Sequence, residues 1–298
     1  MPASVRDWVA AARPRTLTAA VAPVAIGTAA AHAAGGVAWG PALAALAGAG
    51  LLQIGTNFAN DVFDAEKGAD TAERKGPVRA VAAGLISAAA MRAAMIVTFG
   101  LAVAVGVYLV TIGGWPIVAI GLASVAAGVA YTGGPWPLGY HGLGDLFVMI
   151  FFGQVAVCGT AYVQVGDVPA LAWWLSLPVG AVATAILVVN NLRDAETDVK
   201  VGKRTLAVRF GRRFALVEYT ALLALAHGVP IALGLGAVEG VGAWTLLGAA
   251  TAPWAVVLVR RLVRAVPGPE MNVLLGETAK LLLVQSVAMA VGIAIGVG

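Results

Sequence analysis

Residues 42–70, ALAALAGAGLLQIGTNFANDVFDAEKGAD, join a long apolar run to a cluster of acidic side chains, and this combination decides the fold class. A helix of about 20 apolar residues is long enough to cross a hydrocarbon core about 30 Å thick. The 298-residue chain has the same character throughout, since it is 60% hydrophobic and only 11% charged. A soluble domain has roughly 25% charged residues. The composition therefore indicates an integral membrane protein.

The apolar runs predict an all-α bundle of membrane-spanning helices. Backbone exposed to lipid must satisfy its own hydrogen bonds, and continuous apolar runs, in place of alternating ten-residue segments, argue against a β-barrel. We expect residues 1–298 to form a single transmembrane domain. Nine spans are predicted, at residues 16–34, 41–60, 88–112, 115–132, 144–163, 169–192, 213–235, 241–261 and 276–297.

The distribution of basic residues predicts the orientation of the bundle. The 19 Lys and Arg residues lie in the N-terminal segment and in residues 67–92, 193–213, 260–264 and 280. Connections on the other side, such as AAGGVAWG and VQVGDVPA, contain none. By the positive-inside rule the N-terminus is cytoplasmic and the C-terminus lies outside. The net charge of +4 follows from this topology, so no nucleic-acid partner is expected.

The opening segment also has some features of a secretory signal, namely basic residues followed by an apolar stretch. Its removal would leave eight spans and break the alternation of basic connections. We therefore expect this segment to be retained as the first span.

The acidic end of the opening stretch has helical spacing. Asn57, Asp61 and Asp64 fall at positions i, i+4 and i+7, which share one face of a helix, and Asp70 follows just beyond. Glu66 points off this face, so we expect it to be dispensable. The stripe predicts a common role for its polar side chains.

A second polar segment, NNLRDAETDVKVGKRT at residues 190–205, repeats the pattern. Asn191, Asp194 and Asp198 fall at positions i, i+3 and i+7, again on one helix face. An even number of predicted crossings separates the two segments, so both lie at the same, cytoplasmic face of the membrane. We expect the two acidic stripes to meet.

Clustered carboxylates require a cation. Two like charges about 4 Å apart repel by about 4 kcal/mol at an effective dielectric constant near 20. Asp and Asn, without His or Cys, are the hard oxygen ligands that suit Mg²⁺, which commonly bridges carboxylates to substrate phosphates. Basic residues in the same loops are suited to hold phosphate oxygens directly. These residues are Arg74, Lys75, Arg79, Lys203 and Arg204.

Two other interpretations stay open on spacing alone. The acids could belong to ordinary solvated loops whose basic residues set the topology. They could also line a proton or cation pathway, although the motifs lie at span ends and not in mid-membrane.

The motifs resemble those of the UbiA superfamily, a family of intramembrane aromatic prenyltransferases with an NDxxDxxxD-type motif and a second DxxxD motif. The first motif matches Asn60, Asp61 and Asp64, and the second matches Asp194 and Asp198. Gly68 occupies the position of the third acid in the first motif. This departure removes Gly68 from the predicted ligands and leaves Asp70 as a weaker candidate.

Further segments resemble the branch of this family that prenylates 1,4-dihydroxy-2-naphthoate in menaquinone synthesis. They are ARPRTL, RKGPVRAVAAGLIS, NNLRDAETDVKVGKRTLAVRFG and YTGGPWPLGYHGLGD. The wider superfamily has a YxxxK element after span four, whereas here Tyr131 is followed by Pro135 at the lysine position. We therefore do not transfer the role of that lysine.

The resemblance implies an Mg²⁺-dependent transferase of the bacterial inner membrane whose active site faces the cytoplasm. A polyprenyl diphosphate binds through Mg²⁺, ionises to an allylic cation and is attacked by the ring of 1,4-dihydroxy-2-naphthoate, with loss of diphosphate and carbon dioxide. The implied metal ligands are Asn57, Asp61, Asp64, Asn191, Asp194 and Asp198. The implied substrate contacts are Arg15, Asn57, Asn60, Asp70, Lys75, Arg79, Tyr140, Asp145, Asn190, Asn191 and Lys203.

The remaining residue roles are also expectations. The ring of Tyr131 faces the allylic cation, or else anchors the chain at the membrane interface. Tyr140 and Asp145 orient the acceptor, and Asn190 either packs helices or contacts substrate. The acceptor itself could be another aromatic compound, such as 4-hydroxybenzoate or homogentisate. A transporter gated by a cation is the alternative without catalysis.

Overall fold

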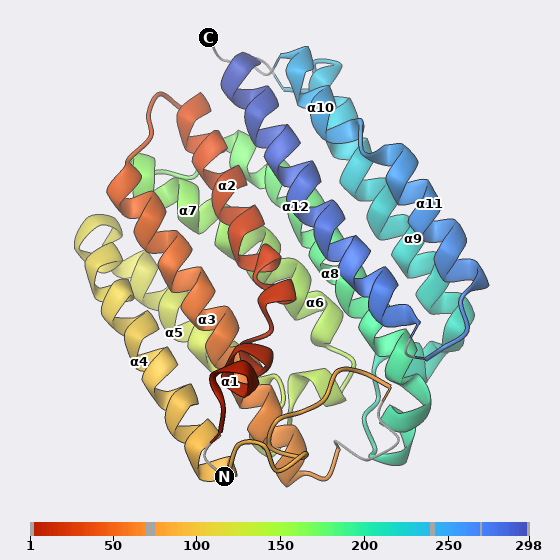
Figure 1. Ribbon diagram of the computed structural model, residues 1–298. Helices are drawn as coiled ribbons and strands as arrows, with labels where there is room; N and C mark the ends of the chain where they lie inside the picture. The colour runs from red at the N-terminus through yellow and green to blue at the C-terminus, as the bar shows by residue number, and fades with distance from the viewer. Residues whose placement is uncertain (1–2, 70–74, 239–241, 269, 297–298) are drawn as a thin grey trace.

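The computed structural model describes residues 3–69, 75–238, 242–268 and 270–296, and every regular element within them is a helix (Figure 1). The prediction of an all-α fold is confirmed for this part of the chain. The α-helices are α1 Val5–Ala12, α2 Thr18–Ala33, α3 Trp39–Glu66, α4 Ala88–Gly113, α5 Trp115–Ala130, α6 Gly144–Val148, α7 Ala156–Val165, α8 Ala170–Lys200, α9 Leu206–Gly234, α10 Leu246–Ala249, α11 Ala252–Arg264 and α12 Met271–Gly296. A π-helical segment, η3 Met149–Val155, joins α6 to α7, and short 3₁₀ turns cover Pro14–Thr16, Leu138–Tyr140 and Ala243–Thr245.

Among the described residues, 7 helical stretches are long and apolar enough to cross a membrane. An eighth is obtained if the segment Val5–Thr16 and α2, which meet at a bend of 45°, form one span. The remaining predicted span, residues 115–132, corresponds to α5, which has only 16 residues. A helix of that length rises about 24 Å, less than the hydrocarbon thickness. Each predicted run thus overlaps a helix, and the count of nine crossings stays a prediction.

Local sequence signals begin several of these helices. Ser4 and Asp7 form a capping box at the start of α1, and the Ser87 hydroxyl accepts the N–H of Ala90 at the start of α4. Gly114, with φ of 64°, separates α4 from α5 at a position where a side chain would be strained. These signals explain why the apolar runs break where they do.

Helix α8 lies at the centre of the larger core. It packs against α2, α9 and α12. In its most apolar stretch of 18 residues, 72% is buried inside the bundle. Gly153 of η3 and Gly180 of α8 allow this helix to approach closely, since a Cβ atom at Gly153 would lie 3.0 Å from the Gly180 Cα. Small residues at such contacts let helix backbones pack tightly in lipid. A second, smaller core joins α1, α3 and α4.

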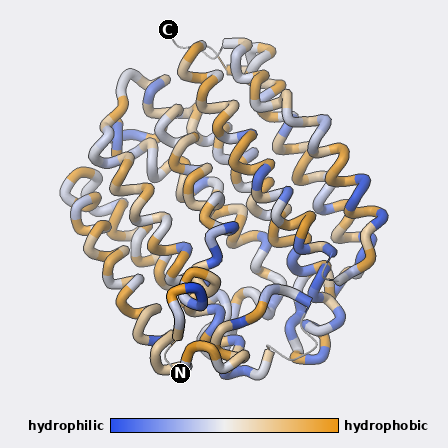
Figure 2. Tube along the Cα trace, in the orientation of Figure 1, coloured by the Kyte–Doolittle hydropathy of each residue, from blue (hydrophilic) through white to orange (hydrophobic). Residues whose placement is uncertain are grey.

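The polar residues gather at one end of the bundle. Figure 2 shows hydrophobic colouring along most of the helices and hydrophilic segments near α1 and in the connections that follow α3 and α8. The end of α12 lies at the opposite end of the bundle (Figure 1). The first and last described helices therefore end at opposite ends of the bundle, and the orientation of the termini in the membrane stays a prediction.

Candidate active site

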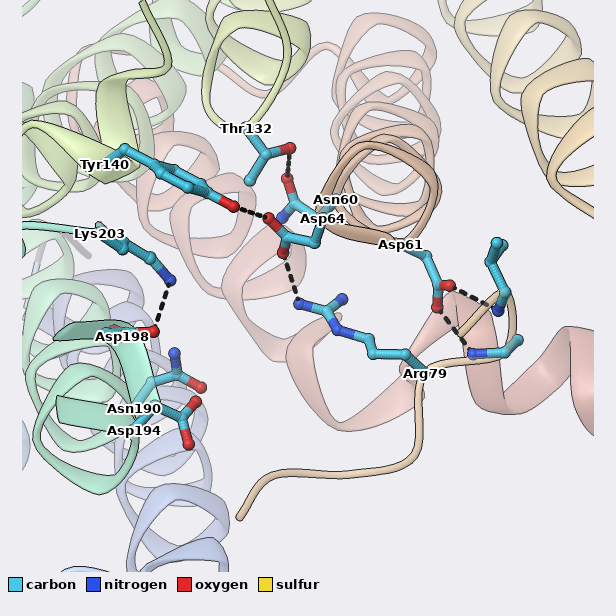
Figure 3. Close-up of polar contacts among 12 residues, drawn as sticks. Asn60, Asp61, Asp64, Arg79, Thr132, Tyr140, Asn190, Asp194, Asp198 and Lys203 are labelled. Carbon is cyan, nitrogen blue, oxygen red and sulfur yellow. Dashed lines mark hydrogen bonds and ion pairs between the residues drawn. The ribbon is translucent and has the colours of Figure 1, made fainter. Parts of the chain in front are cut away.

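The two acidic segments form the C-terminal ends of α3 and α8, at the polar end of the bundle. The connection between α5 and α6, residues 131–143, lies between them, and residues 75–87 lead from the first motif into α4. Asp64 of the first motif and Asp194 and Asp198 of the second lie around a common region, whereas Asp61 points away from it (Figure 3).

Asp64 is the most extensively paired acid of the first motif. Its Oδ2 lies 3.1 Å from Nη2 of Arg79, and both side chains are buried. The hydroxyl of Tyr140 donates a hydrogen bond of 2.9 Å to Oδ1 of Asp64 (Figure 3). Arg79 and Tyr140 were both predicted as substrate contacts, and in this structure they bind a predicted metal ligand.

Asp61 has a different environment, although it is only three residues from Asp64. Its carboxylate accepts the backbone N–H of Val81 at 2.9 Å and of Ala80 at 3.2 Å, and it is 1% exposed. Figure 3 shows the side chain directed away from Asp64. Asp61 therefore anchors the segment that carries Arg79.

The two asparagines of the first segment point to other elements. The Asn57 amide donates to the carbonyl of Ala12 at 3.0 Å and to Oγ1 of Thr16 at 3.2 Å, so it ties α3 to the junction of α1 and α2. Asn60 accepts the hydroxyl of Thr132 at 2.9 Å. The predicted helix face is thus divided among three different neighbours.

The second motif is built around Arg193, a residue that was not predicted as part of the site. Its guanidinium donates to both oxygens of Asp194, at 2.8 and 2.5 Å, and also to Oδ1 of Asn190 and Oδ1 of Asn272. Arg193 is 1% exposed. A buried charge is costly unless it is paired and hydrogen-bonded. One signal in the sequence could have revealed it. Arg193 directly follows the predicted span at residues 169–192 and lies beside Asn and Asp residues.

The second acid of this motif faces a lysine. The side-chain Nζ of Lys203 lies 3.6 Å from Oδ1 of Asp198. The backbone N–H of Lys203 also donates to the backbone carbonyl of Asp198 at 2.9 Å. Asn191 is 4% exposed, on the same stretch of α8. The turn after α8 therefore returns a cation to the acid that ends the motif.

Tyr140 connects the two motifs. Besides its bond to Asp64, its ring lies 5.0 Å from Nζ of Lys67 and 5.8 Å from Nζ of Lys203. The Tyr140 carbonyl accepts the N–H of Arg204 at 2.8 Å. Cations at these distances from a ring face are attracted by its quadrupole. The side chain thus links Asp64 of α3 to the lysine that pairs with the second motif.

Lys67 caps the end of α3 and reaches the α5–α6 connection. Its Nζ donates to the carbonyls of Thr132 at 2.5 Å and Gly134 at 3.3 Å. Burial lowers the pKa of this lysine, and the charge of Asp64 opposes that shift. Lys67 is therefore a further cation at the site that was not among the predicted contacts.

Tyr131 is the C-cap residue of α5, and its hydroxyl is close enough to both acidic motifs to be affected by their charges. The charges of Asp145, Asp64 and Asp198 all act on its hydroxyl. A Cβ atom at Gly144 would lie 2.9 Å from that hydroxyl, so the start of α6 packs against it. The role of this ring toward the allylic cation stays a prediction.

The other predicted contacts are more peripheral. Arg15 is exposed on the 3₁₀ turn before α2. Lys75 Nζ lies 2.5 Å from Oε2 of Glu196 and also donates to the Pro267 carbonyl at 3.2 Å, so it joins the first loop to α8. Asp70 and Arg74 lie outside the described residues.

Protein cations neutralise three of the four acids predicted to bind metal. Arg79 pairs with Asp64, Arg193 with Asp194 and Lys203 with Asp198. Within the described ranges of the chain, no three His, Cys, Asp or Glu side chains converge closely enough to hold a metal ion. The donors themselves are carboxylates, the hard oxygen type that Mg²⁺ prefers. The donor chemistry fits this ion, and binding it requires these ion pairs to open.

Known proteins resemble this chain along almost its whole length. Residues 20–295 match the model of the UbiA prenyltransferase family. The chain is 38% identical, over 99% of its length and 99% of the relative's, to a 1,4-dihydroxy-2-naphthoate octaprenyltransferase of Mycobacterium tuberculosis.

Two solved structures share the fold. The apo structure of a UbiA homologue from Aeropyrum pernix K1 has a TM-score of 0.71 and 18% identity, covering 92% of this chain and 97% of that one. A UbiA homologue from Archaeoglobus fulgidus bound to GPP and Mg²⁺ has a TM-score of 0.65 and 14% identity, covering 95% and 99%.

Proposed function

Because this chain belongs to the UbiA prenyltransferase family, we propose that it transfers a polyprenyl group from a polyprenyl diphosphate to 1,4-dihydroxy-2-naphthoate. Diphosphate and carbon dioxide are released, and the product is a demethylmenaquinol for menaquinone synthesis. The similarity to the mycobacterial naphthoate octaprenyltransferase along the whole chain carries this proposal. Other aromatic acceptors, such as 4-hydroxybenzoate or homogentisate, are outcomes that the test below separates.

The chain functions as a multi-pass protein of the bacterial inner membrane, with nine spans and the acidic end of the bundle in the cytoplasm. The 19 basic residues, which lie in or near the connections on one side, support this orientation. A soluble diphosphate product then leaves on the side where the acidic motifs lie.

Arg79 and Lys203 bind the diphosphate of the donor. In the structure each pairs with a carboxylate, Asp64 and Asp198 respectively. Arginine makes charge-assisted hydrogen bonds to phosphate as well as to carboxylate oxygens, and lysine binds phosphate as a point charge. These two cations can therefore pass from the acids to the donor as it binds, and Lys67 lies close enough to Tyr140 to join them.

The carboxylates of Asp64 and Asp198, once Arg79 and Lys203 leave them, would hold Mg²⁺ together with Asp194, once Arg193 releases it. The ion would neutralise charge on the leaving diphosphate. The relative bound to GPP and Mg²⁺ supports this assignment. Asp61 and Asn57, also predicted as ligands, are weaker candidates because backbone N–H groups and the α1–α2 junction engage them. Asn191 remains a predicted ligand.

Tyr131 provides the ring face for the allylic cation, an attraction of about 0.5–2 kcal/mol depending on desolvation. Its hydroxyl lies in the field of both acidic motifs, which supports a position between donor and acceptor. Tyr140 holds Asp64 in place from the side of the α5–α6 connection.

An acceptor panel with the purified protein tests the proposed function. Diphosphate release and prenylated product are measured with 1,4-dihydroxy-2-naphthoate, 4-hydroxybenzoate and homogentisate in turn. Turnover that depends on the naphthoate supports the proposal. Turnover with another acceptor and none with the naphthoate contradicts it.

A further inference from the structure

The carboxylate of Asp145 is buried and unbonded. The residue is 6% exposed, and neither carboxylate oxygen has a hydrogen-bond partner among the described residues. A buried polar group without a partner forfeits hydrogen bonds that water would otherwise supply, and the cost is larger for a charged group. Native structures contain few such groups, so this one calls for a partner beyond the residues that the structure describes.

The position of Asp145 places it beside the proposed reaction centre. The preceding residue, Gly144, packs against the Tyr131 hydroxyl, and the Asp145 carbonyl accepts a long hydrogen bond of 3.5 Å from Thr184 of α8. Burial raises the pKa of the Tyr131 hydroxyl, and the neighbouring charges of Asp145, Asp64 and Asp198 raise it further. The carboxylate is thus near the proposed cation-stabilising ring and shares none of the hydrogen bonds that occupy the acidic motifs.

The position of Asp145 in the first turn of α6 does not by itself explain why its carboxylate is buried. An acid in the first turn of α6 is favoured by the helix dipole, but an exposed carboxylate obtains the same benefit without the cost of burial. Both oxygens are nevertheless buried, and no residue in the described part of the chain donates a hydrogen bond to them. A ligand with an O–H donor is the partner that satisfies them.

We propose that Asp145 is the catalytic residue that binds and deprotonates the acceptor, by accepting the phenolic O–H next to the ring carbon that is attacked. This assignment rests on the proposed function, and it names the group on the acceptor side of the same site. The other candidate, Tyr140, has its hydroxyl engaged by Asp64 and its ring flanked by Lys67 and Lys203. Tyr140 therefore belongs to the diphosphate side.

The step balances without a further reagent. As the allylic carbon bonds to the ring carbon that bears the carboxylate, the adjacent O–H bond breaks, its proton passes to the Asp145 carboxylate, and its electron pair forms a ketone. The bond to the carboxylate then breaks, carbon dioxide leaves, and the freed electron pair restores the aromatic ring and the oxygen anion. Asp145 returns the proton to that oxygen, so the residue ends in its initial state.

Asp145→Asn tests this role because the amide keeps the size of the side chain and cannot take the proton. Proton transfer by a positioned side chain contributes about 10²–10⁴-fold to a rate. We expect kcat for naphthoate prenylation to fall by about that factor, with the KM for polyprenyl diphosphate changed by less than about threefold. Asp145→Glu, which retains a carboxylate, should recover part of the loss.

Two matched variants complete the experiment. Asp167→Asn makes the same change at an exposed residue in the connection between α7 and α8, and should leave kcat unchanged. Glu218→Gln removes the carboxylate on α9 whose electrostatic environment includes Asp145. If Glu218→Gln loses turnover and Asp145→Asn does not, the assignment of the base is wrong.

Other outcomes are equally decisive. Asp145→Asn with kcat within about threefold of wild type overturns the proposal, as does a higher KM for the diphosphate with unchanged kcat. Should Asp145→Asn fail to accumulate as a folded protein, Asp145→Ser provides the same comparison. Wild-type turnover on the acceptor panel tests the proposed function separately, because the Asp145 variants are compared with wild type on whichever phenolic acceptor it uses.

Discussion

The hydroxyl of Tyr140 donates a 2.9 Å hydrogen bond to Asp64, and this contact joins the α5–α6 connection to the acidic end of α3. The backbone carbonyl of the same tyrosine accepts the N–H of Arg204, beyond the end of α8. Two motifs that are about 130 residues apart are therefore linked through one residue, by its hydroxyl on one side and its backbone carbonyl on the other.

Tyr140→Phe removes the hydroxyl and keeps the ring. A hydrogen bond of this kind contributes about 1 kcal/mol, or 1.5–3 kcal/mol when one partner is charged. We expect the KM for polyprenyl diphosphate to rise by roughly five- to tenfold or more, because Asp64 loses one of its two partners. Steady-state kinetics in detergent check this, with Tyr108→Phe on α4 as the matched control. An unchanged KM for Tyr140→Phe would show that the bridge has no role in donor binding.

Substitutions at Asp61 and at Asp64 are expected to affect turnover and thermal stability differently. Asp64→Asn and Asp194→Asn should reduce the turnover of the folded protein by more than their loss of thermal stability explains, since both acids are assigned to the donor site. Each change also leaves a buried arginine, Arg79 or Arg193, without its carboxylate and should lower the unfolding temperature. Asp61→Ala should lower turnover and the unfolding temperature together, because the N–H groups of Ala80 and Val81 lose their acceptor. Activity assays and thermal unfolding of the same preparations separate the two patterns.

Glu66→Gln serves as the control for these acids. Glu66 pairs with Arg92 on α4, and both side chains are substantially exposed. Exposed ion pairs contribute about 0–1 kcal/mol. Full turnover is expected, and a large loss would mean that the first motif extends beyond the residues assigned to it.

Arg193 should control stability as well as activity. Removing one member of a buried ion pair typically costs about 3–5 kcal/mol, because the remaining charge is uncompensated. Arg193→Leu is therefore expected to unfold at a much lower temperature than wild type. Arg193→Lys keeps the charge but loses the planar guanidinium that reaches Asp194, Asn190 and Asn272. Its unfolding temperature should lie between those of Arg193→Leu and wild type. Equal stability of the leucine variant and wild type would contradict this account.

Removal of divalent cations should stop the reaction. Excess chelator is expected to abolish diphosphate release, and added Mg²⁺ should restore it, since Asp64, Asp194 and Asp198 are proposed to hold the ion. The assay follows diphosphate before and after addition of the metal. Turnover that persists in chelator would exclude a role for the metal in donor binding.

The sequence predicted the helices and the acidic faces more completely than the partners of each side chain. Apolar runs and capping residues such as Ser87 define where helices begin, and these signals are local. Periodicity correctly placed Asn57, Asp61 and Asp64 near one another on α3. It could not show that they contact the α1–α2 junction, the backbone at residues 80–81 and Tyr140 respectively, because those partners depend on tertiary packing.

Arg193 was missed for a related reason. Neighbouring residues on a helix do not normally face one another, so spacing alone does not suggest that Arg193 folds back onto Asp194. Its further bond to Asn272 joins α8 to α12, a contact of long sequence separation. Lys67 likewise reaches Thr132 and Gly134 only because α5 ends beside α3.

The most direct test of the central claim is the mass of the product formed by purified wild-type protein from 1,4-dihydroxy-2-naphthoate and polyprenyl diphosphates of several chain lengths in Mg²⁺. The account predicts a product heavier than the acceptor by the prenyl group and lighter by carbon dioxide, formed together with diphosphate. No such product, alongside turnover of a different acceptor under the same conditions, would contradict it.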